Sequence, residues 1–418
     1  MSHYAKLFGV ASACLLSAAI GITIGKKQNG EVHFTPPTNI NNNNENSALP
    51  VVLPPGVPQR SAKEMERDFL KKCEDIGRLG LPGSQEVRCY GGYISSLNYE
   101  RRIPNFVMEV YPNENENNDN NNNKASRSKS NFYADPSVPS LFQVKPDSYL
   151  HLQDGLSRGH LAPAQSYKHS QIEMDNTFNM NANIVPQDMT LNALDWLRLE
   201  NLVRKIGKQI SNHKDNKLYV ISGPAFVSQE VRQVTTEQQQ QAVLLETSHT
   251  TAGRPKTVIQ HDVVGRGPHG PTVAVPTHLF KVLLSASNKE YHAAAFLFPN
   301  KPLSEERPLT SYQVPLSRLE SLTGLQFFPQ LPSNQKKNFL NLCHKYKCDH
   351  TRTAGLFSHY RDVAALREAN SIPQLQATLQ EIKKKNTSKE TLDAAVQREY
   401  ERRSEELLKE AMRSIDEV

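Results

Sequence analysis

The sequence predicts a protein that contains both strands and helices, with the helices concentrated after Pro329. Between residues 87 and 298, short segments rich in β-branched and aromatic residues alternate with turn residues, as strands do. Beyond Pro329 the chain is charged, and its apolar residues recur at helical spacing. With 418 residues, the chain is long enough for two or three units.

The chain begins with a candidate membrane anchor. Residues 7–25 carry no charge and lie between Lys6 and Lys26, so this segment could cross a bilayer as one helix. We therefore assign residues 1–27 to an anchor or targeting segment. A cleaved secretory signal is the alternative, because small residues stand at Ala18 and Ala19. The lack of acidic residues before Glu31 also suits mitochondrial import.

Three polar tracts interrupt the chain. Residues 28–60 are rich in Asn and Pro, residues 112–125 hold a run of Asn, and residues 233–255 contain four Gln in a row. Such compositions cannot bury enough apolar surface to become ordered. We therefore predict a disordered linker at 28–60 and surface insertions at the other two tracts.

The expected elements follow in order along the chain. A helix is predicted at 61–77, followed by a strand–turn–strand at 87–110, strands at 217–222, 256–264, 278–286 and 291–298, and a long helix at 388–414. The partial apolar stripe of the last helix indicates packing against the main body. A short coiled coil is the alternative, although the heptads are irregular.

The charge and the cysteines set further limits. The net charge of +6 suits a polyanionic partner, but it is common in other proteins too. Five cysteines in so long a chain argue against a disulfide scaffold. Cys343 and Cys348 are the one close pair, and His344 and His350 beside them make a zinc site conceivable. Two reduced thiols or one local disulfide are the simpler interpretations.

The residues with the clearest chemical potential lie between 147 and 200. His160 ends the sequence Ser157-Arg158-Gly159-His160, where a histidine near a cleft could take a proton from water at neutral pH. Taken alone, one of 14 histidines is more often structural or simply exposed.

Asn192 begins a helical run in which Trp196 and Glu200 follow at steps of four, so that the three side chains share one face. For an arbitrary helix these would be a capping Asn, a buried Trp and a solvated Glu. Phosphodiester hydrolysis needs a base and a cation, and Mg²⁺ needs few protein ligands when phosphate supplies oxygens. One Asn oxygen near one His is therefore sufficient, and no paired-acid cluster elsewhere indicates a two-metal site.

Three motifs together resemble the DNA/RNA non-specific ββα-metal endonucleases. They are SRGH (157–160), NIVPQ (183–187) and the helical Asn192. Ser157 replaces the Asp usual in this family, which resembles the mitochondrial exo/endonuclease G branch. Further segments similar to that branch are GLPG with RCY (80–90), RIPNFV (102–107), VISGP (220–224), VAVPTHLFKV (273–282) and GLQFFP (324–329).

The resemblance implies roles for six residues. His160 would be the general base, Asn192 the direct Mg²⁺ ligand, with Mn²⁺ able to substitute, and Glu200 the carboxylate that holds the water shell of the metal. The others would act on the substrate or the base: Asn183 would steady His160 or the phosphate, Arg127 would brace the scissile phosphate, and Arg158 would make structural bonds or contact backbone phosphate.

The resemblance also implies an α+β fold, a ββα-metal (His-Me finger) core with a mixed central sheet at 61–332, and a helical extension at 333–418. It implies a homodimer that cleaves DNA and RNA with a 5′–3′ exonuclease bias, in mitochondrial DNA repair or clearance. The expected location is the mitochondrial inner membrane, facing the intermembrane space. The alternatives are a secreted nuclease and a catalytically dead, membrane-tethered nucleic-acid-binding protein.

Overall fold

The computed structural model describes most of the chain after residue 48. The described residues are 49–111, 124–149, 155–211, 216–231, 256–265, 272–287, 290–350, 352–353, 355–385 and 393–416. The predicted anchor at 7–25 lies outside them, as do most of the predicted linker and nearly all of both insertions. Within the described residues, no helix is both long and apolar enough to cross a membrane.

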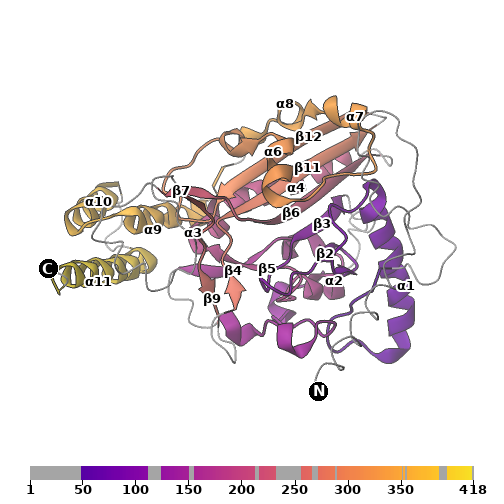
Figure 1. Ribbon diagram of the computed structural model, residues 1–418, viewed down its shortest axis with the longest axis horizontal. Coiled ribbons are helices and arrows are strands. Elements are labelled where there is room, and N and C mark those ends of the chain that lie inside the picture. Colours follow the sequence, from indigo (N-terminus) through magenta and orange to yellow (C-terminus); the bar gives the residue numbers. More distant parts are fainter. Residues whose placement is uncertain are drawn as a thin grey trace, which may run out of the picture. The chain divides into compact units, whose positions relative to one another are not determined.

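An eight-stranded mixed sheet forms the centre of the fold (Figure 1). Seven strands follow the order β1–β2–β3–β6–β11–β12–β13 with antiparallel pairing, and β14 joins β12 in parallel. Their bounds are β1 (Val87–Cys89), β2 (Ile94–Ser96), β3 (Phe106–Tyr111), β6 (Lys217–Ala225), β11 (His278–Ser287), β12 (Glu290–Pro299), β13 (Gln313–Val314) and β14 (Leu340–Asn341).

Three two-stranded sheets and the helices surround this sheet. The small sheets pair β4 (Leu156–His160) with β5 (Ile184–Asp188), β7 (Gln229–Val231) with β8 (Lys256–Val258), and β9 (Val263–Val264) with β10 (Val273–Ala274). The helices are α1 (Gln59–Ile76), α2 (Gln171–Asn176), α3 (Met189–Leu191), α4 (Leu197–Ile210), α6 (Leu316–Thr323), α7 (Ser333–Lys337), α8 (Leu342–Tyr346), α9 (His359–Glu368), α10 (Ile372–Lys385) and α11 (Ala394–Asp416).

Each face of the central sheet has its own hydrophobic core, because side chains alternate between the two faces of a strand. On one face, Val220 and Leu283 of the sheet pack with Leu199 and Ile206 of α4 and with residues of β5. The opposite face buries Phe69 of α1 among side chains of the sheet and α6. The site described below lies on the α4 side.

Most of the predicted elements are confirmed, although several differ in extent. The helix predicted at 61–77 is α1, which runs from Gln59 to Ile76. The strand–turn–strand predicted at 87–110 is three strands, β1, β2 and β3, and the described part of the last predicted helix is α11, which begins at Ala394. The predicted strand at 256–264 is instead two short strands, β8 and β9, in different small sheets. Residues 50–52, within the predicted linker, are ordered against β1, where the Val52 amide donates to the Cys89 carbonyl at 2.8 Å.

Four of the cysteines form disulfides. Cys343 and Cys348 are joined, so the local-disulfide interpretation is confirmed, and the zinc and reduced-thiol interpretations are wrong. Cys73 of α1 and Cys89 of β1 form a second disulfide that the sequence did not predict. This bond ties the first helix to the edge of the central sheet.

The C-terminal extension is helical, as predicted. Helices α9, α10 and α11 lie together (Figure 1) and bury a core of their own that includes Val363, Leu375 and Leu407. Ala395, Tyr400 and Leu407 of the predicted stripe thus pack within the extension rather than against the main body, whereas Leu408 is exposed. Contacts between α9 and the site are described below.

Candidate active site

A strand–strand–helix element carries the candidate residues. β4 and β5 pair antiparallel, with Ser157 opposite Gln187 and His160 opposite Ile184. The chain then continues directly into a helical run at 189–210, made of α3, the π-helical segment η6 (Asn192–Trp196) and α4. The helical run passes back along β4, so that Asn192 at the start of η6 contacts Ser157 and Trp196 at the end of η6 contacts the His160 carbonyl. A π-helical turn inside a helix is often found at functional sites.

His160 is buried in an aromatic setting. Its ring meets Phe178 edge-on at 5.0 Å between centroids and Phe132 at 5.7 Å. The ring also makes a hydrogen bond to the backbone of Arg158. Nε2 has no partner among the described residues, so we assign that bond to Nδ1. A neutral ring with its proton on Nδ1 leaves Nε2 free to accept a proton.

Burial and positive charge keep this ring neutral. Desolvation, together with the nearby guanidinium groups of Arg127 and Arg158, lowers the pKa of His160 to about 3. The bond to the Arg158 backbone opposes this shift, because it favours the protonated form. At neutral pH, His160 is thus available as a base.

Asn192 is oriented by the first residue of the SRGH motif. Its Nδ2 donates to Ser157 Oγ at 3.1 Å, and Ser157 Oγ donates in turn to the Gln187 carbonyl at 3.0 Å. Since the amide nitrogen is used in this way, the amide oxygen Oδ1 is left for another partner. Ser157 in place of the usual Asp therefore keeps a structural role toward Asn192.

Glu200 is buried two turns beyond Asn192, and it is connected to the histidine strand. The Trp196 indole N–H donates to the His160 carbonyl at 3.1 Å and also reaches the Glu200 carboxylate. Burial raises the pKa of Glu200, while the cationic groups of Lys281, Arg204 and Arg127 oppose this rise. These three cations thus favour the ionised carboxylate.

The structure adds three charged residues that the motifs did not indicate. Lys281 of β11 is buried, donates from Nζ to the Leu161 carbonyl at 3.1 Å, and lies 4.7 Å from the centroid of the Trp196 ring. Glu109 of β3 is also buried, and desolvation raises its pKa to about 7. Arg204 lies one turn after Glu200, with 3.9 Å between their charged atoms. Lys281 and Glu109 come from distant strands, so no local spacing indicates them.

Asn183 acts on the loop that follows His160. It is fully buried, accepts from the Ala162 amide at 2.8 Å, and donates to the carbonyls of Ala162 at 2.9 Å and Thr177 at 2.8 Å. These bonds occupy both amide protons and the oxygen. Of the two roles that the resemblance implied, the structure therefore favours steadying the histidine over contacting phosphate.

Arg127 and Arg158 form the cationic edge of the site. The guanidinium of Arg158 stacks 4.2 Å from the centroid of Phe132, and that of Arg127 lies 5.9 Å from the centroid of Phe178. Both aromatic rings also contact His160. Arg127 is exposed in the short helix η2 (Arg127–Lys129), so it can reach a bound anion.

The oxygen donors of the site, Asn192 and Glu200, suit a hard cation that retains most of its water ligands. In the part of the chain that the structure describes, no three His, Cys, Asp or Glu side chains gather as a metal site. The Asn192 oxygen and the Glu200 carboxylate stand on one helix face, and both are oxygen donors. Mg²⁺ is bound through few protein oxygens together with water and phosphate.

Comparison with known proteins identifies what this chain is similar to. The model of the DNA/RNA non-specific endonuclease family matches residues 75–334. The mitochondrial nuclease EXOG of Danio rerio is 33% identical over 73% of this chain and 78% of its own length. The human mitochondrial nuclease EXOG is 30% identical over 79% of this chain and 80% of its own.

A solved structure agrees with these relatives. A crystal structure of the complex of EndoG with EndoGI has a TM-score of 0.51 and 28% sequence identity to this chain. The match covers 63% of this chain and 94% of that one. The predicted ββα-metal core with a mixed central sheet is confirmed by this likeness.

Proposed function

We propose that this chain, which belongs to the DNA/RNA non-specific endonuclease family, is a Mg²⁺-dependent nuclease with His160 as its general base. Membership of that family makes it a nucleic-acid-hydrolysing enzyme. The observation that carries the proposal is the free Nε2 of a buried, neutral His160 on the strand whose Ser157 orients Asn192. Such a base can act on a water molecule at neutral pH.

In the proposed reaction, His160 Nε2 takes a proton from water as the water oxygen bonds to phosphorus. The bond from phosphorus to O3′ breaks, which leaves a 5′-phosphate and, after protonation by solvent, a 3′-hydroxyl. Arg127 braces the scissile phosphate, because a guanidinium can donate two parallel hydrogen bonds to phosphate oxygens. Arg158 contacts a neighbouring backbone phosphate.

Asn192 Oδ1 would hold the metal directly, and Glu200 would accept hydrogen bonds from its water ligands. When bound, Mg²⁺ supplies positive charge that stabilises the phosphorane-like transition state and the leaving oxygen. Asn183 acts as a positioning residue that fixes the chain after His160. Mn²⁺, which accepts similar oxygen ligands, would substitute.

The relatives support a mitochondrial location, since the two EXOG proteins are named mitochondrial. We propose the inner membrane, facing the intermembrane space, with attachment through residues 7–25. The two disulfides are compatible with that side of the membrane, because disulfides persist in oxidising compartments. We further propose a homodimer with a 5′–3′ exonuclease bias that acts in mitochondrial DNA repair or clearance.

The test uses DNA duplexes labelled at the 5′ or the 3′ end, with and without Mg²⁺. Wild type should cleave only with the metal, and Asn192→Ala should require roughly 10- to 100-fold more Mg²⁺. Asn334→Ala, on the exposed surface of α7, is the matched control. Early release of the 5′ label supports the exonuclease bias. Binding without any cleavage would overturn the proposal in favour of a dead nuclease fold.

A further inference from the structure

Two buried carboxylates flank the turn that presents Asn192. Asp188 caps the helical run, with Oδ1 accepting from the amides of Thr190 at 2.8 Å and Leu191 at 3.1 Å. Asp195 lies within η6 and is fully buried. Asn192 stands between them in sequence, so the positions of these two carboxylates constrain the backbone that carries the candidate metal ligand.

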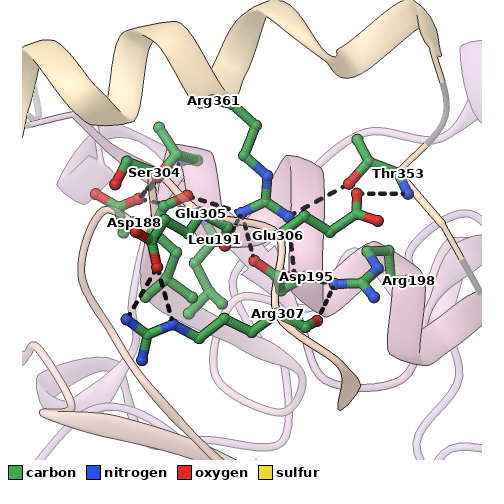
Figure 2. Close-up of polar contacts among 12 residues, drawn as sticks. Asp188, Leu191, Asp195, Arg198, Ser304, Glu305, Glu306, Arg307, Thr353 and Arg361 are labelled. Carbon is green, nitrogen blue, oxygen red and sulfur yellow. Dashed lines mark hydrogen bonds and ion pairs between the residues drawn. The ribbon is translucent and has the colours of Figure 1, made fainter. Parts of the chain in front are cut away.

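Arg361 of α9 forms an ion pair with Asp195. It reaches down from its helix to Asp195 (Figure 2), with Nη1 to Oδ2 at 2.7 Å and Nη2 to Oδ1 at 3.0 Å. Its Nη1 also donates to the Leu303 carbonyl at 2.7 Å. Arg198 on α4 supplies a further cation to Asp195. Two parallel, charge-assisted bonds at a buried carboxylate fix its orientation as well as its charge.

Arg367 of the same helix forms an ion pair with Asp188. Its Nη1 lies 3.1 Å from Asp188 Oδ2, the oxygen that the helix cap leaves free, and 3.4 Å from the Gly155 carbonyl. Gly155 lies just before β4, and a Cβ added there would meet Arg367 Nη2 at 1.7 Å. Nε of Arg367 pairs with Glu399 of α11 at 3.1 Å. Arg367 therefore joins the histidine strand, the helix cap and the extension.

Both arginines lie outside the part of the chain that the family model matches, which ends at residue 334. They are spaced so that one helix contacts the residues before and after Asn192. Their side chains are 13% and 5% exposed, so solvent screens these pairs little. Loss of Arg367 would leave the buried Asp188 without its charged partner, and loss of Arg361 would leave the buried Asp195 with Arg198 as its remaining cation. Removing a partner from a buried charge is costly enough to move the backbone.

We propose that α9 is a brace for the metal site, in which Arg361 and Arg367 act as positioning residues that set the metal affinity of Asn192. This inference rests on the proposed function of Asn192 as metal ligand. Partners beyond the ligand itself commonly change metal affinity by about 10- to 100-fold. The C-terminal extension would therefore act on the reaction through the helix that it contacts.

The experiment measures Mn²⁺ binding to the full chain from the loss of the free Mn²⁺ signal in electron paramagnetic resonance. A parallel assay measures the Mg²⁺ concentration that gives half-maximal DNA cleavage. The proteins compared are wild type, the double variant Arg361→Met with Arg367→Met, and Arg403→Met. Arg403 bonds to the Ala369 carbonyl and pairs with Glu406 and Glu410, all within the extension. Arg403→Met thus controls for general weakening of the extension.

The double variant should raise both the Mn²⁺ dissociation constant and the Mg²⁺ requirement about tenfold, while the rate at saturating metal stays close to wild type. Unchanged metal affinity in a folded double variant, or an equal rise in Arg403→Met, overturns the brace. If the double variant does not fold, the single variant Arg361→Lys tests the proposal instead. Lysine keeps the positive charge but lacks the two parallel donors, so the metal affinity should fall by a smaller factor. An unchanged metal affinity in Arg361→Lys overturns the brace. A wild type that cleaves equally well without metal overturns the proposed function instead.

Discussion

His160 and Glu200 are both buried titratable groups in one site, yet their surroundings act on them in opposite ways. For His160, burial and the nearby cations both disfavour the charged form, and the pKa falls to about 3. For Glu200, burial raises the pKa, and the same kind of cations oppose that rise. Arg127 contributes to both effects.

The difference shows what the cationic edge of the site does. Positive charge disfavours an imidazolium and favours a carboxylate, so the same arginine serves a neutral base and an anionic partner. Hydrolysis through a hydrated metal needs both at one pH. The central claim is therefore that the site holds a neutral imidazole beside an ionised carboxylate.

The largest expected effect comes from removing one of the two compared groups, His160 or Glu200. His160→Ala should lower the cleavage rate at saturating Mg²⁺ about 10³-fold, because it removes the general base. Glu200→Gln should lower it by roughly 10- to 100-fold, since the amide still fills the position. Single-turnover cleavage of labelled duplex measures both. His344→Ala, on the exposed surface of α8, should match wild type, and an equal loss there would contradict the assignment.

Removing Lys281 tests how the nearby cations affect the pKa of the Glu200 carboxylate. Lys281 lowers the pKa of both Glu200 and Glu109, so Lys281→Met raises both and lets Glu200 take up a proton at higher pH. The acid limb of the pH profile for cleavage should shift upward by about one pH unit. Lys409→Met, exposed on α11, should leave the profile unchanged. A profile in Lys281→Met that superimposes on wild type would show that Lys281 does not act on Glu200.

Much of this site was predictable, and the reason is local spacing. SRGH, NIVPQ and the helical Asn192 identified His160, Asn192 and Glu200 as candidates, and the structure gathers them in one strand–strand–helix element. The motifs are informative because a strand end and the following helix bring nearby residues together.

Lys281, Glu109 and Arg361 could not be predicted in this way. Each comes from an element far from the motif in sequence, and only the packing of the sheet and of α9 places it at the site. The Cys73–Cys89 disulfide was missed for the same reason, since α1 and β1 must first pack together. The predicted strand at 256–264 contained a break that its β-branched residues did not reveal.

The smallest expected effect concerns the glycine beside the base. A Cβ at Gly159 would lie 2.0 Å from Gln187 Oε1 on the neighbouring strand. Gly159→Ala should therefore lower the free energy of unfolding by about 1–3 kcal/mol, through forced repacking of a buried side chain. Gly355→Ala meets no atom within 4 Å and should be nearly neutral. Equal thermal melting of the two variants would contradict the close packing of β4 against β5.

The central claim is tested most directly by nitrogen-15 NMR of the histidine rings between pH 5 and pH 8, with the His160 signals identified by their loss in His160→Ala. His160 should remain a neutral ring with its proton on Nδ1 throughout, because its pKa is lowered to about 3 from the ordinary histidine value of 6.5. A His160 ring that becomes protonated with a midpoint near that ordinary value would contradict the claim.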